Sequence, residues 1–176
     1  SAVRKLGPSL APGAVLVTKS TVPVGTHRRV LEWVGRTDVH AVSNPEFLRE
    51  GTAVRDFLEG DRIVIGATDD AAADAVAALY RGLRGTLLRT DPAAAELLKF
   101  AANAFLATKV SFANEISRLC DGLGANIDAV IRGIGADPRI GRSFLEPGPG
   151  WGGSCFPKDT SALAYLAREH HVDLPV

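Results

Sequence analysis

One uninterrupted helical segment constrains the fold of this chain more than any other feature. Asp91 is a favourable N-cap residue, Pro92 suits the first position of a helix, and no glycine or proline follows until Gly122. The sequence therefore predicts one helix over residues 92–121, about thirty residues and on the order of 45 Å long. A rod of this length can span two domains or two subunits.

Apolar side chains lie around much of this helix rather than along one stripe: Leu97, Phe100, Ala101, Ala104, Phe105, Ala107 and Phe112. Such a distribution predicts burial on more than one side. Two interpretations stay open at this point. The helix is either the core helix of one chain or is buried partly against a second copy, and the second interpretation predicts a homodimer formed through residues 92–121.

Short apolar runs alternate with helical patterns in the first half of the chain. Strands are predicted at 14–18, 40–42, 63–65 and 86–88, and helices at 26–34 and 69–81. Strands joined by helices indicate an α/β fold with a mostly parallel sheet. Beyond the long helix, further helices are predicted from 126 or 127 to 134 and over 157–168, so this part of the chain is expected to be all-helical.

Charge and composition exclude several classes of function. The 176 residues include 20 basic and 20 acidic side chains, so no net field attracts the chain to nucleic acid or to an anionic membrane. No apolar run approaches the roughly 18–20 residues that cross a bilayer, and the first residues lack the pattern of a signal peptide. We therefore expect no nucleic-acid or membrane partner and a cytoplasmic location. The two cysteines have no Cys or His nearby at zinc-ligand spacing, so no metal site is predicted.

The stretch PGPGWGGSCFPKD (147–159) places a cysteine directly after a glycine-rich loop. Glycines let the backbone approach a ligand without hindrance from Cβ atoms. Pro157 suits the first turn of a helix, so Cys155 is expected near unpaired amide groups, with Lys158 adding positive charge. Both effects favour a nucleophilic thiolate, and a buried structural cysteine is the competing interpretation. Cys120, within the long helix, is interpreted as a core residue.

Three other stretches carry polar side chains where ligands commonly bind. Lys99 and Asn103 are four residues apart in the long helix, so both project from one face and could hold an alkoxide or orient a hydroxyl. Glu46 and Glu50 follow the second predicted strand and could face one pocket. The turn at 18–26 joins a strand to a helix and could cradle phosphate. Spacing alone favours simpler interpretations, namely a lysine that extends to solvent and solvated carboxylates.

Taken in order, five segments resemble the UDP-glucose 6-dehydrogenase family, within the UDP-glucose/GDP-mannose dehydrogenases: STVPVGT (20–26), NPEFLREG (44–51), ELLKFAANAF (96–105), DPRIG (137–141) and FLEPGPGWGGSCFPKD (144–159). These enzymes oxidise the 6-hydroxyl of a nucleotide sugar to a carboxylate with two NAD. The resemblance implies the later part of a Rossmann-like parallel sheet in residues 1–90 and a helical central, dimerisation domain in residues 91–176. The family's N-terminal dinucleotide fingerprint and C-terminal UDP-binding domain are expected to lie outside this chain.

The resemblance also implies catalytic roles. Cys155 would add to the aldehyde formed in the first oxidation, giving a thiohemiacetal and then a thioester that water hydrolyses. Lys99 and Asn103 would stabilise the oxyanion. Asp159 and Thr21 would position water and protons, and Glu46 would act as a base or orient water.

The same resemblance implies contacts with cofactor and substrate. NAD would be contacted by Ser20, Thr21, Val22, Glu50 and Lys158. The UDP-sugar would be contacted by Glu46, Lys99 and Asn103, and by residues of two motifs: Phe47, Leu48, Phe144, Leu145, Gly148, Gly150, Trp151 and Gly152. Arg139 would reach across a dimer interface into the neighbouring sugar site.

Two alternatives stay open. A sibling dehydrogenase acting on GDP-mannose or a UDP-N-acetyl sugar would use the same chemistry, and FPKD (156–159) favours UDP-glucose without deciding between them. A dimerisation module without activity would be expected to lose Cys155, Lys99 or Asp159, and all three are present. The chain by itself is expected to have little activity. Trp151, where a smaller aromatic residue is expected, and Arg49 depart from the family pattern.

Overall fold

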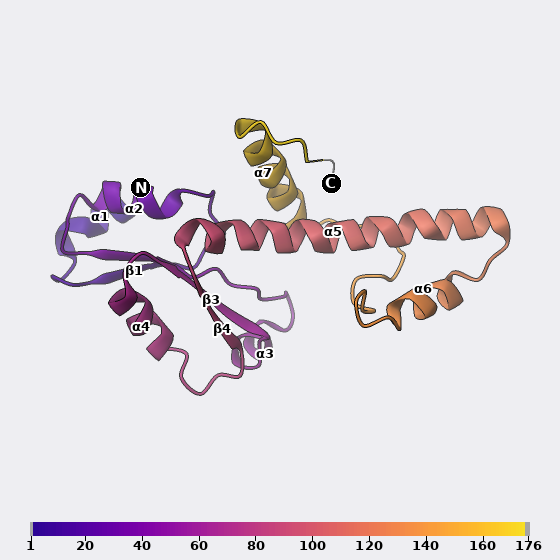
Figure 1. Ribbon diagram of the computed structural model, residues 1–176, viewed down its shortest axis with the longest axis horizontal. Coiled ribbons are helices and arrows are strands. Elements are labelled where there is room, and N and C mark those ends of the chain that lie inside the picture. Colours follow the sequence, from indigo (N-terminus) through magenta and orange to yellow (C-terminus); the bar gives the residue numbers. More distant parts are fainter. Residues whose placement is uncertain (1, 175–176) are drawn as a thin grey trace. The chain divides into compact units, whose positions relative to one another are not determined.

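The chain forms two compact units, seen in a computed structural model that describes residues 2–174 (Figure 1). The first unit comprises Ser1–Lys99 and the second Phe100–Val176. The boundary falls inside the long helix α5 (Pro92–Leu123), which therefore contributes residues to both units. The domain boundary expected after residue 90, where strand β4 ends, stays a prediction.

A four-stranded sheet with helices forms the first unit. Its strands are β1 (Val15–Thr18), β2 (His40–Ser43), β3 (Arg62–Ala67) and β4 (Thr86–Thr90), in the spatial order β1-β2-β3-β4. The connecting helices are α1 (Ala2–Leu6), the 3₁₀ turn η1 (Gly7–Ser9), α2 (Thr26–Val34), α3 (Ala53–Leu58) and α4 (Asp70–Ala78). The predicted α/β class is confirmed.

The sheet is parallel except at one pair of strands. Strand β1 runs parallel to β2, with Val15 opposite His40, and β3 runs parallel to β4. Strands β2 and β3 are antiparallel, with Val42 opposite Ala67. A parallel pair needs a crossover helix packed on the sheet, whereas α3, the only helix of the β2–β3 connection, has no buried residue. The connection therefore makes no crossover, and β3 runs in the opposite direction to β2.

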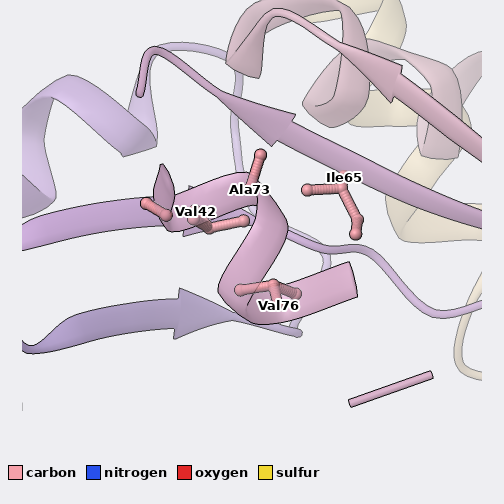
Figure 2. Packing of buried hydrophobic residues seen from close by; sticks show 5 residues of the cluster. Val42, Ile65, Ala73 and Val76 are labelled. Carbon is pink, nitrogen blue, oxygen red and sulfur yellow. The ribbon is translucent and has the colours of Figure 1, made fainter. Parts of the chain in front are cut away.

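The core of this unit lies between the sheet and α4. Val42 of β2 and Ile65 of β3 pack against Ala73 and Val76 of α4 (Figure 2). Asp69 caps this helix, because its carboxylate Oδ1 accepts a hydrogen bond of 2.7 Å from the amide of Ala72. Helix α2 packs against β2 on the other face of the sheet, so both faces are covered (Figure 1).

Two elements differ from the sequence prediction. Helix α4 ends at Ala78, short of the predicted Arg81, and the chain passes into a series of turns before Gly82, whose φ is +89°. Tyr80, within these turns, is hydrogen-bonded to residues far away in sequence, a contact that a local pattern does not reveal. Helix α3 was not predicted, because a short helix without a buried face has no apolar periodicity.

The second unit is helical, as predicted. Besides the larger part of α5 it contains α6 (Ile127–Gly135) and α7 (Phe156–Glu169). Asn126 caps α6 through its side-chain oxygen, which accepts from the amide of Ala129 at 3.1 Å. Ala113 of α5, Ile131 of α6 and Leu145 form its buried apolar cluster. Cys120 is buried as expected.

Within residues 2–174, none of the helices combines the length and apolarity that a membrane span requires.

Gly66 of β3 marks a close approach between the sheet and the start of α5. A Cβ atom at this position would lie 2.5 Å from the Cβ of Ala95 and 2.9 Å from the carbonyl oxygen of Asp91. Real Cβ atoms are essentially never this close to such neighbours. The absence of a side chain at Gly66 therefore lets the first turn of α5 pack directly on β3.

Replacing Gly66 by alanine should lower the free energy of unfolding by about 1–3 kcal/mol, because the added methyl group has to displace backbone atoms. Gly122→Ala is the matched control, since a Cβ there meets no atom within 4 Å. This control should leave stability unchanged or raise it by up to about 1 kcal/mol through helix propensity. Urea denaturation of the full-length protein measures both, and equal stabilities of the two variants would contradict the close-approach argument.

Candidate active site

The loop after β1 and the end of β2 form a polar edge of the sheet in the first unit. Thr18 and Ser43 are the last residues of two parallel strands, and ligands of α/β proteins bind at such carboxyl ends. A small hollow lies here, lined by Thr18, Ser20, Thr21, Val22, Ser43, Pro45, Glu96 and Lys99. The predicted cofactor residues Ser20, Thr21 and Val22 are therefore beside the predicted catalytic residue Lys99.

The side chain of Glu96 in α5 accepts three hydrogen bonds at this edge. Its carboxylate accepts from the backbone amide of Gly25 at 2.7 Å, from that of His27 at 2.8 Å and from the hydroxyl of Ser43 at 3.0 Å. The residue is only 3% exposed. Because an ionised carboxylate is costly to bury without donors, these three hydrogen bonds explain how the charge is accommodated.

The N-terminus of α2 is consequently not available to phosphate in the way the sequence suggested. Gly25 is the N-cap residue of α2, and the amides of Gly25 and His27 both point to the Glu96 carboxylate. A phosphate at the same amides would have to lie against a buried negative charge, which Coulomb repulsion opposes. The hypothesis of a phosphate cradle at this helix is therefore wrong, because a residue distant in sequence already supplies the anion.

Lys99 lies one turn after Glu96 in α5 and is 5% exposed. Its Nζ atom is 3.9 Å from Oε1 of Glu46 and 5.1 Å from the centre of the Phe47 ring. The other carboxylate oxygen of Glu46 accepts a hydrogen bond of 2.6 Å from the amide of Leu48. The structure thus joins Lys99 to the predicted residues Glu46 and Phe47, and the interpretation of Lys99 as a lysine that extends to solvent is wrong.

A second network holds the start of the segment NPEFLREG (44–51). Nζ of Lys19 donates to Oδ1 of Asn44 at 3.0 Å and to the hydroxyl of Tyr80 at 2.9 Å, and that hydroxyl donates to the same Oδ1. The amide group of Asn44 donates to the carbonyl of Val64 at 2.7 Å. Asn44 is 1% exposed, so its polar atoms are satisfied inside the protein. These contacts connect the ends of β1 and β2.

Other residues of this segment are more exposed. Glu50 and Leu48 are both exposed and do not line the hollow. Arg49 donates to the carboxylate of Asp56 through its guanidinium, at 3.0 and 2.6 Å, and through its backbone amide at 2.9 Å. The Arg49 hydrogen bonds hold the pKa of the Asp56 carboxyl well below its usual range. Arg49, a departure from the family pattern, therefore closes a local turn.

His27 is buried next to Glu96, and neither ring nitrogen has a hydrogen-bond partner within the described part of the chain. Burial lowers the pKa of the imidazole below its usual 6.5, and the negative charge of Glu96 opposes this shift without cancelling it. The imidazole is therefore neutral near pH 7.

In the second unit, three of the predicted residues are hydrogen-bonded to one another: Asn103, Lys158 and Asp159. Asp159 in the first turn of α7 is 1% exposed, and its carboxylate accepts from Nδ2 of Asn103 at 2.6 Å and from Nζ of Lys158 at 2.6 Å. Asn103 is itself buried. The ammonium and amide donors compensate the buried carboxylate, and Asp159 in turn fixes the orientation of the Asn103 side chain.

Cys155 is the N-cap residue of α7 and its side chain is exposed. The sulfur atom makes no capping hydrogen bond, and its hydrogen-bond neighbour is the hydroxyl of Ser154 at 3.7 Å. The interpretation of Cys155 as a buried structural residue is therefore wrong. Activation of its thiol by the helix amides stays a prediction.

The glycine-rich loop before Cys155 is fastened to α5. The amide of Gly148 donates to the side chain of Asn114 at 2.9 Å, and Nε1 of Trp151 donates to the hydroxyl of Ser111 at 2.9 Å. Gly150 has a φ of +102°, which explains the need for glycine there. Trp151 uses its indole nitrogen, which phenylalanine and tyrosine lack, so the indole anchors the loop.

The aromatic residues around this loop contact one another. The ring of Phe156 lies 6.3 Å from that of Phe144 and 6.4 Å from that of Trp151, measured between centres. Phe144 has a φ of +64°, an unusual conformation for a residue other than glycine. Leu145 beside it is 2% exposed and belongs to the apolar cluster, so its side chain is not available to a ligand.

Arg139 extends along the surface of the second unit. Its side chain is 87% exposed, and its guanidinium donates to both carboxylate oxygens of Asp137. This pairing raises the pKa of Arg139 and lowers that of Asp137. The role of Arg139 at a partner's sugar site stays a prediction.

Among residues 2–174, no group of three or more His, Cys, Asp or Glu side chains is arranged to hold a metal ion.

Sequence reasoning missed Glu96, Ser43 and His27. One signal was present, because Glu96 lies three residues before Lys99 on an otherwise apolar part of the long helix. A carboxylate at such a position requires buried donors. The sequence did not indicate that the donors are backbone amides of another helix.

The first unit offers features that suit NAD. Ser20, Thr21 and Val22 line the hollow at the carboxyl ends of two parallel strands, a common place for dinucleotides. The neighbouring helix N-terminus is occupied by Glu96, so the residues present fit a neutral part of the cofactor better than its pyrophosphate.

Comparisons with known proteins agree with this arrangement. Residues 1–84 match the sequence profile of the UDP-glucose/GDP-mannose dehydrogenase family, NAD binding domain, and residues 93–176 match that of the family's central domain. A UDP-glucose 6-dehydrogenase of Rhizobium meliloti is 50% identical over 185 residues, covering 100% of this chain and 42% of the relative. The UDP-glucose 6-dehydrogenase YwqF of Bacillus subtilis is 47% identical, covering 98% of this chain and 41% of the relative.

A solved structure supports the same relationship. The UDP-glucose dehydrogenase of the archaeon Pyrobaculum islandicum superposes with a TM-score of 0.90 at 44% identity, covering 97% of this chain and 41% of that structure. The chain belongs to the UDP-glucose/GDP-mannose dehydrogenase family and carries sequence of its NAD-binding and central domains, so NAD is its cofactor. It spans about two fifths of the length of these relatives.

The buried imidazole of His27 predicts a pH dependence of stability. The folded state binds the His27 proton less tightly than the unfolded state, so stability is complete above about pH 6.5 and falls as the pH decreases below that value. His27→Leu should show a flatter decline in melting temperature between about pH 6.5 and 5 than the wild-type protein. His170→Gln, at an exposed position, is the control and should retain the wild-type slope. Parallel slopes for all three proteins would refute the assignment to His27.

Proposed function

We propose that this chain is part of an NAD-dependent enzyme that oxidises the 6-hydroxyl of UDP-glucose to the carboxylate, giving UDP-glucuronate. The observation that carries the proposal is the exposed thiol of Cys155 at the start of α7, one helical turn before the buried Asp159. Relatives named UDP-glucose 6-dehydrogenase, similar over the whole chain, support the choice of UDP-glucose. A cysteine suits this chemistry, because an alcohol oxidised twice passes through an aldehyde that must be retained.

The proposed roles follow the chemistry of each side chain. NAD, when bound, accepts a hydride from C6 of the sugar in each of the two oxidations. The Cys155 sulfur bonds to the aldehyde carbon and its proton moves to the oxygen, giving a thiohemiacetal. After the second oxidation, water adds to the thioester, the carbon–sulfur bond breaks, and the thiol and a carboxylate are released.

The polar residues stabilise charge and move protons in this scheme. Lys99, a buried ammonium, stabilises the oxyanion on the sugar, and Glu46 beside it acts as a base or orients water. Asn103 shares the oxyanion role, in an orientation maintained by its hydrogen bond to Asp159. Asp159 and Thr21 position water and protons.

Binding roles complete the proposal. Ser20, Thr21 and Val22 contact NAD from the loop after β1, with Glu50 and Lys158 as further contacts. The segment from Phe144 to Gly152 contacts the UDP part of the substrate, and its anchors on α5 support a preformed loop. The proposed location of the enzyme is the cytoplasm.

Cys155→Ser in the full-length protein tests the nucleophile. This variant should reduce formation of UDP-glucuronate at least about a hundredfold, because a hydroxyl is a much weaker nucleophile than a thiolate. Cys120→Ser, at a buried position in α5, is the control for general effects of removing a thiol. The measurements are NADH release and mass analysis of the products. Acid formation by Cys155→Ser at the wild-type rate would contradict the proposal.

The same assay decides the substrate. NADH release should be at least about tenfold faster with UDP-glucose than with GDP-mannose or UDP-N-acetylmannosamine. Faster NADH release with either of the other sugars would support the proposed reaction but would contradict UDP-glucose as the substrate. No oxidation of any of the three would favour a module without activity.

We also propose a homodimer formed through residues 92–121. In the second unit, α5 carries exposed Phe105, Phe112 and Leu119 at seven-residue intervals, so these side chains lie along one face of the helix. Their exposed fractions are 65%, 46% and 56%. An apolar row of this kind on a long helix is the pattern that pairs with a second helix.

Phe105→Ser/Phe112→Ser should convert a dimer into a monomer, since it removes most of the apolar surface of this row. Glu115→Ser, at an exposed polar position of the same helix, is the matched control and should remain dimeric. Light scattering coupled to gel filtration measures the mass. A double variant with the mass of the wild-type dimer would refute the proposed interface.

A further inference from the structure

The N-terminus of α2 lacks any local cap. Its N-cap residue is Gly25, which has no side chain, and its first turn contains no acidic residue. The first turn instead contains two exposed arginines, Arg28 and Arg29, whose charge is unfavourable beside the partial positive charge of a helix N-terminus. Some other group has to satisfy the first amides of this helix.

Glu96 supplies what the local sequence lacks. It is separated from its partners by 71, 69 and 53 residues along the chain, and its two carboxylate oxygens take one amide each from Gly25 and His27. The hydroxyl of Ser43 shares Oε1 with the His27 amide. One carboxylate therefore connects the loop after β1, the end of β2 and the start of α5.

Within the described residues 2–174, no ion pair to this carboxylate is found. His27 of α2 interacts electrostatically with Glu96, but its imidazole is neutral near pH 7 as described above. Lys99 on α5 is paired with Glu46 instead. The negative charge is compensated by amide dipoles, in the manner of an anion bound at a helix N-terminus.

The same loop contains the residues assigned to NAD. Ser20, Thr21 and Val22 line the hollow together with Glu96, and Gly25 ends the loop. Gly25 has a φ of +89°, so the chain turns sharply where Glu96 holds it. Loss of the carboxylate would free this turn and leave two buried amides without an acceptor.

We propose that Glu96 is a positioning residue that acts as a built-in anion, holding the loop of residues 20–25 in the conformation that binds NAD. This inference rests on the proposed role of Ser20, Thr21 and Val22 as NAD contacts. It also implies that the amides of Gly25 and His27 would not contact the pyrophosphate of NAD, since both already donate to Glu96.

The first test removes the Glu96 carboxylate by mutation and then adds a small carboxylate, formate, to the solution. Glu96→Ala in the full-length protein should lower the melting temperature by roughly 5 °C and weaken NAD binding about tenfold. Sodium formate, which fits the vacated position, should restore much of both losses, whereas sodium chloride at equal ionic strength should not. Glu32→Ala is the matched control, because Glu32 is an exposed glutamate of α2. This control should bind NAD normally and show no response to formate.

A second variant covers the case in which Glu96→Ala does not fold. Glu96→Gln keeps the shape of the side chain but turns an NH₂ group toward donors. Amide hydrogen exchange at Gly25 and His27 should become at least about tenfold faster, with exchange in α4 unchanged. If Glu96 only stabilised the fold, Glu96→Gln would destabilise the whole protein, and amide exchange would become faster by similar factors in α2 and α4.

The outcomes separate this inference from the proposed function. Wild-type protein that fails to bind NAD would count against the proposed function and remove the cofactor role of the loop. Normal NAD affinity in Glu96→Ala, or losses that formate does not restore while the variant remains folded, would overturn the role of Glu96 even if the enzyme oxidises UDP-glucose.

Discussion

The buried carboxylate of Glu96 is the interaction on which the arrangement of the first unit depends. An ionised carboxylate can be buried only where several donors converge, and here two amides of the α2 N-terminus and the hydroxyl of Ser43 provide them. Placing Glu96 at this point also places Lys99, one turn further along α5, beside Glu46 and Phe47. One electrostatic requirement therefore sets the position of the loop proposed to contact NAD and of the lysine proposed to be catalytic.

Polar residues of α5 hold loops in both units by the same principle. In the second unit Asn103 donates to the buried Asp159, and Ser111 and Asn114 accept from the glycine-rich loop before Cys155. The buried Asn103–Asp159 hydrogen bond holds the start of α7, because buried polar groups are stable only when their hydrogen bonds are satisfied. The two more exposed hydrogen bonds restrict the positions of the glycine-rich loop. A long helix with polar residues among apolar ones can thus be a scaffold for several binding loops.

The local character of each signal explains which site residues were predictable. Cys155 was proposed as a candidate because its motif is continuous in sequence, and Lys99 and Asn103 because helical spacing places them on one face. Glu96 lay within a quoted motif and was still missed, since its partners are more than fifty residues away. The phosphate hypothesis failed for the same reason, because the amides of α2 looked free until the distant carboxylate was placed on them.

The sequence by itself determined most elements of this protein: four strands, a long helix opened by Asp91 and Pro92, and the short helix α6, within one or two residues for most boundaries. These follow from periodicity and capping, which are properties of neighbouring residues. Only the tertiary structure decided that β3 runs antiparallel to β2 and that α4 ends before Tyr80. It also decided that the anion at α2 comes from Glu96. Each of these depends on contacts between segments far apart in the chain, and no local pattern encodes which distant donor and acceptor will meet.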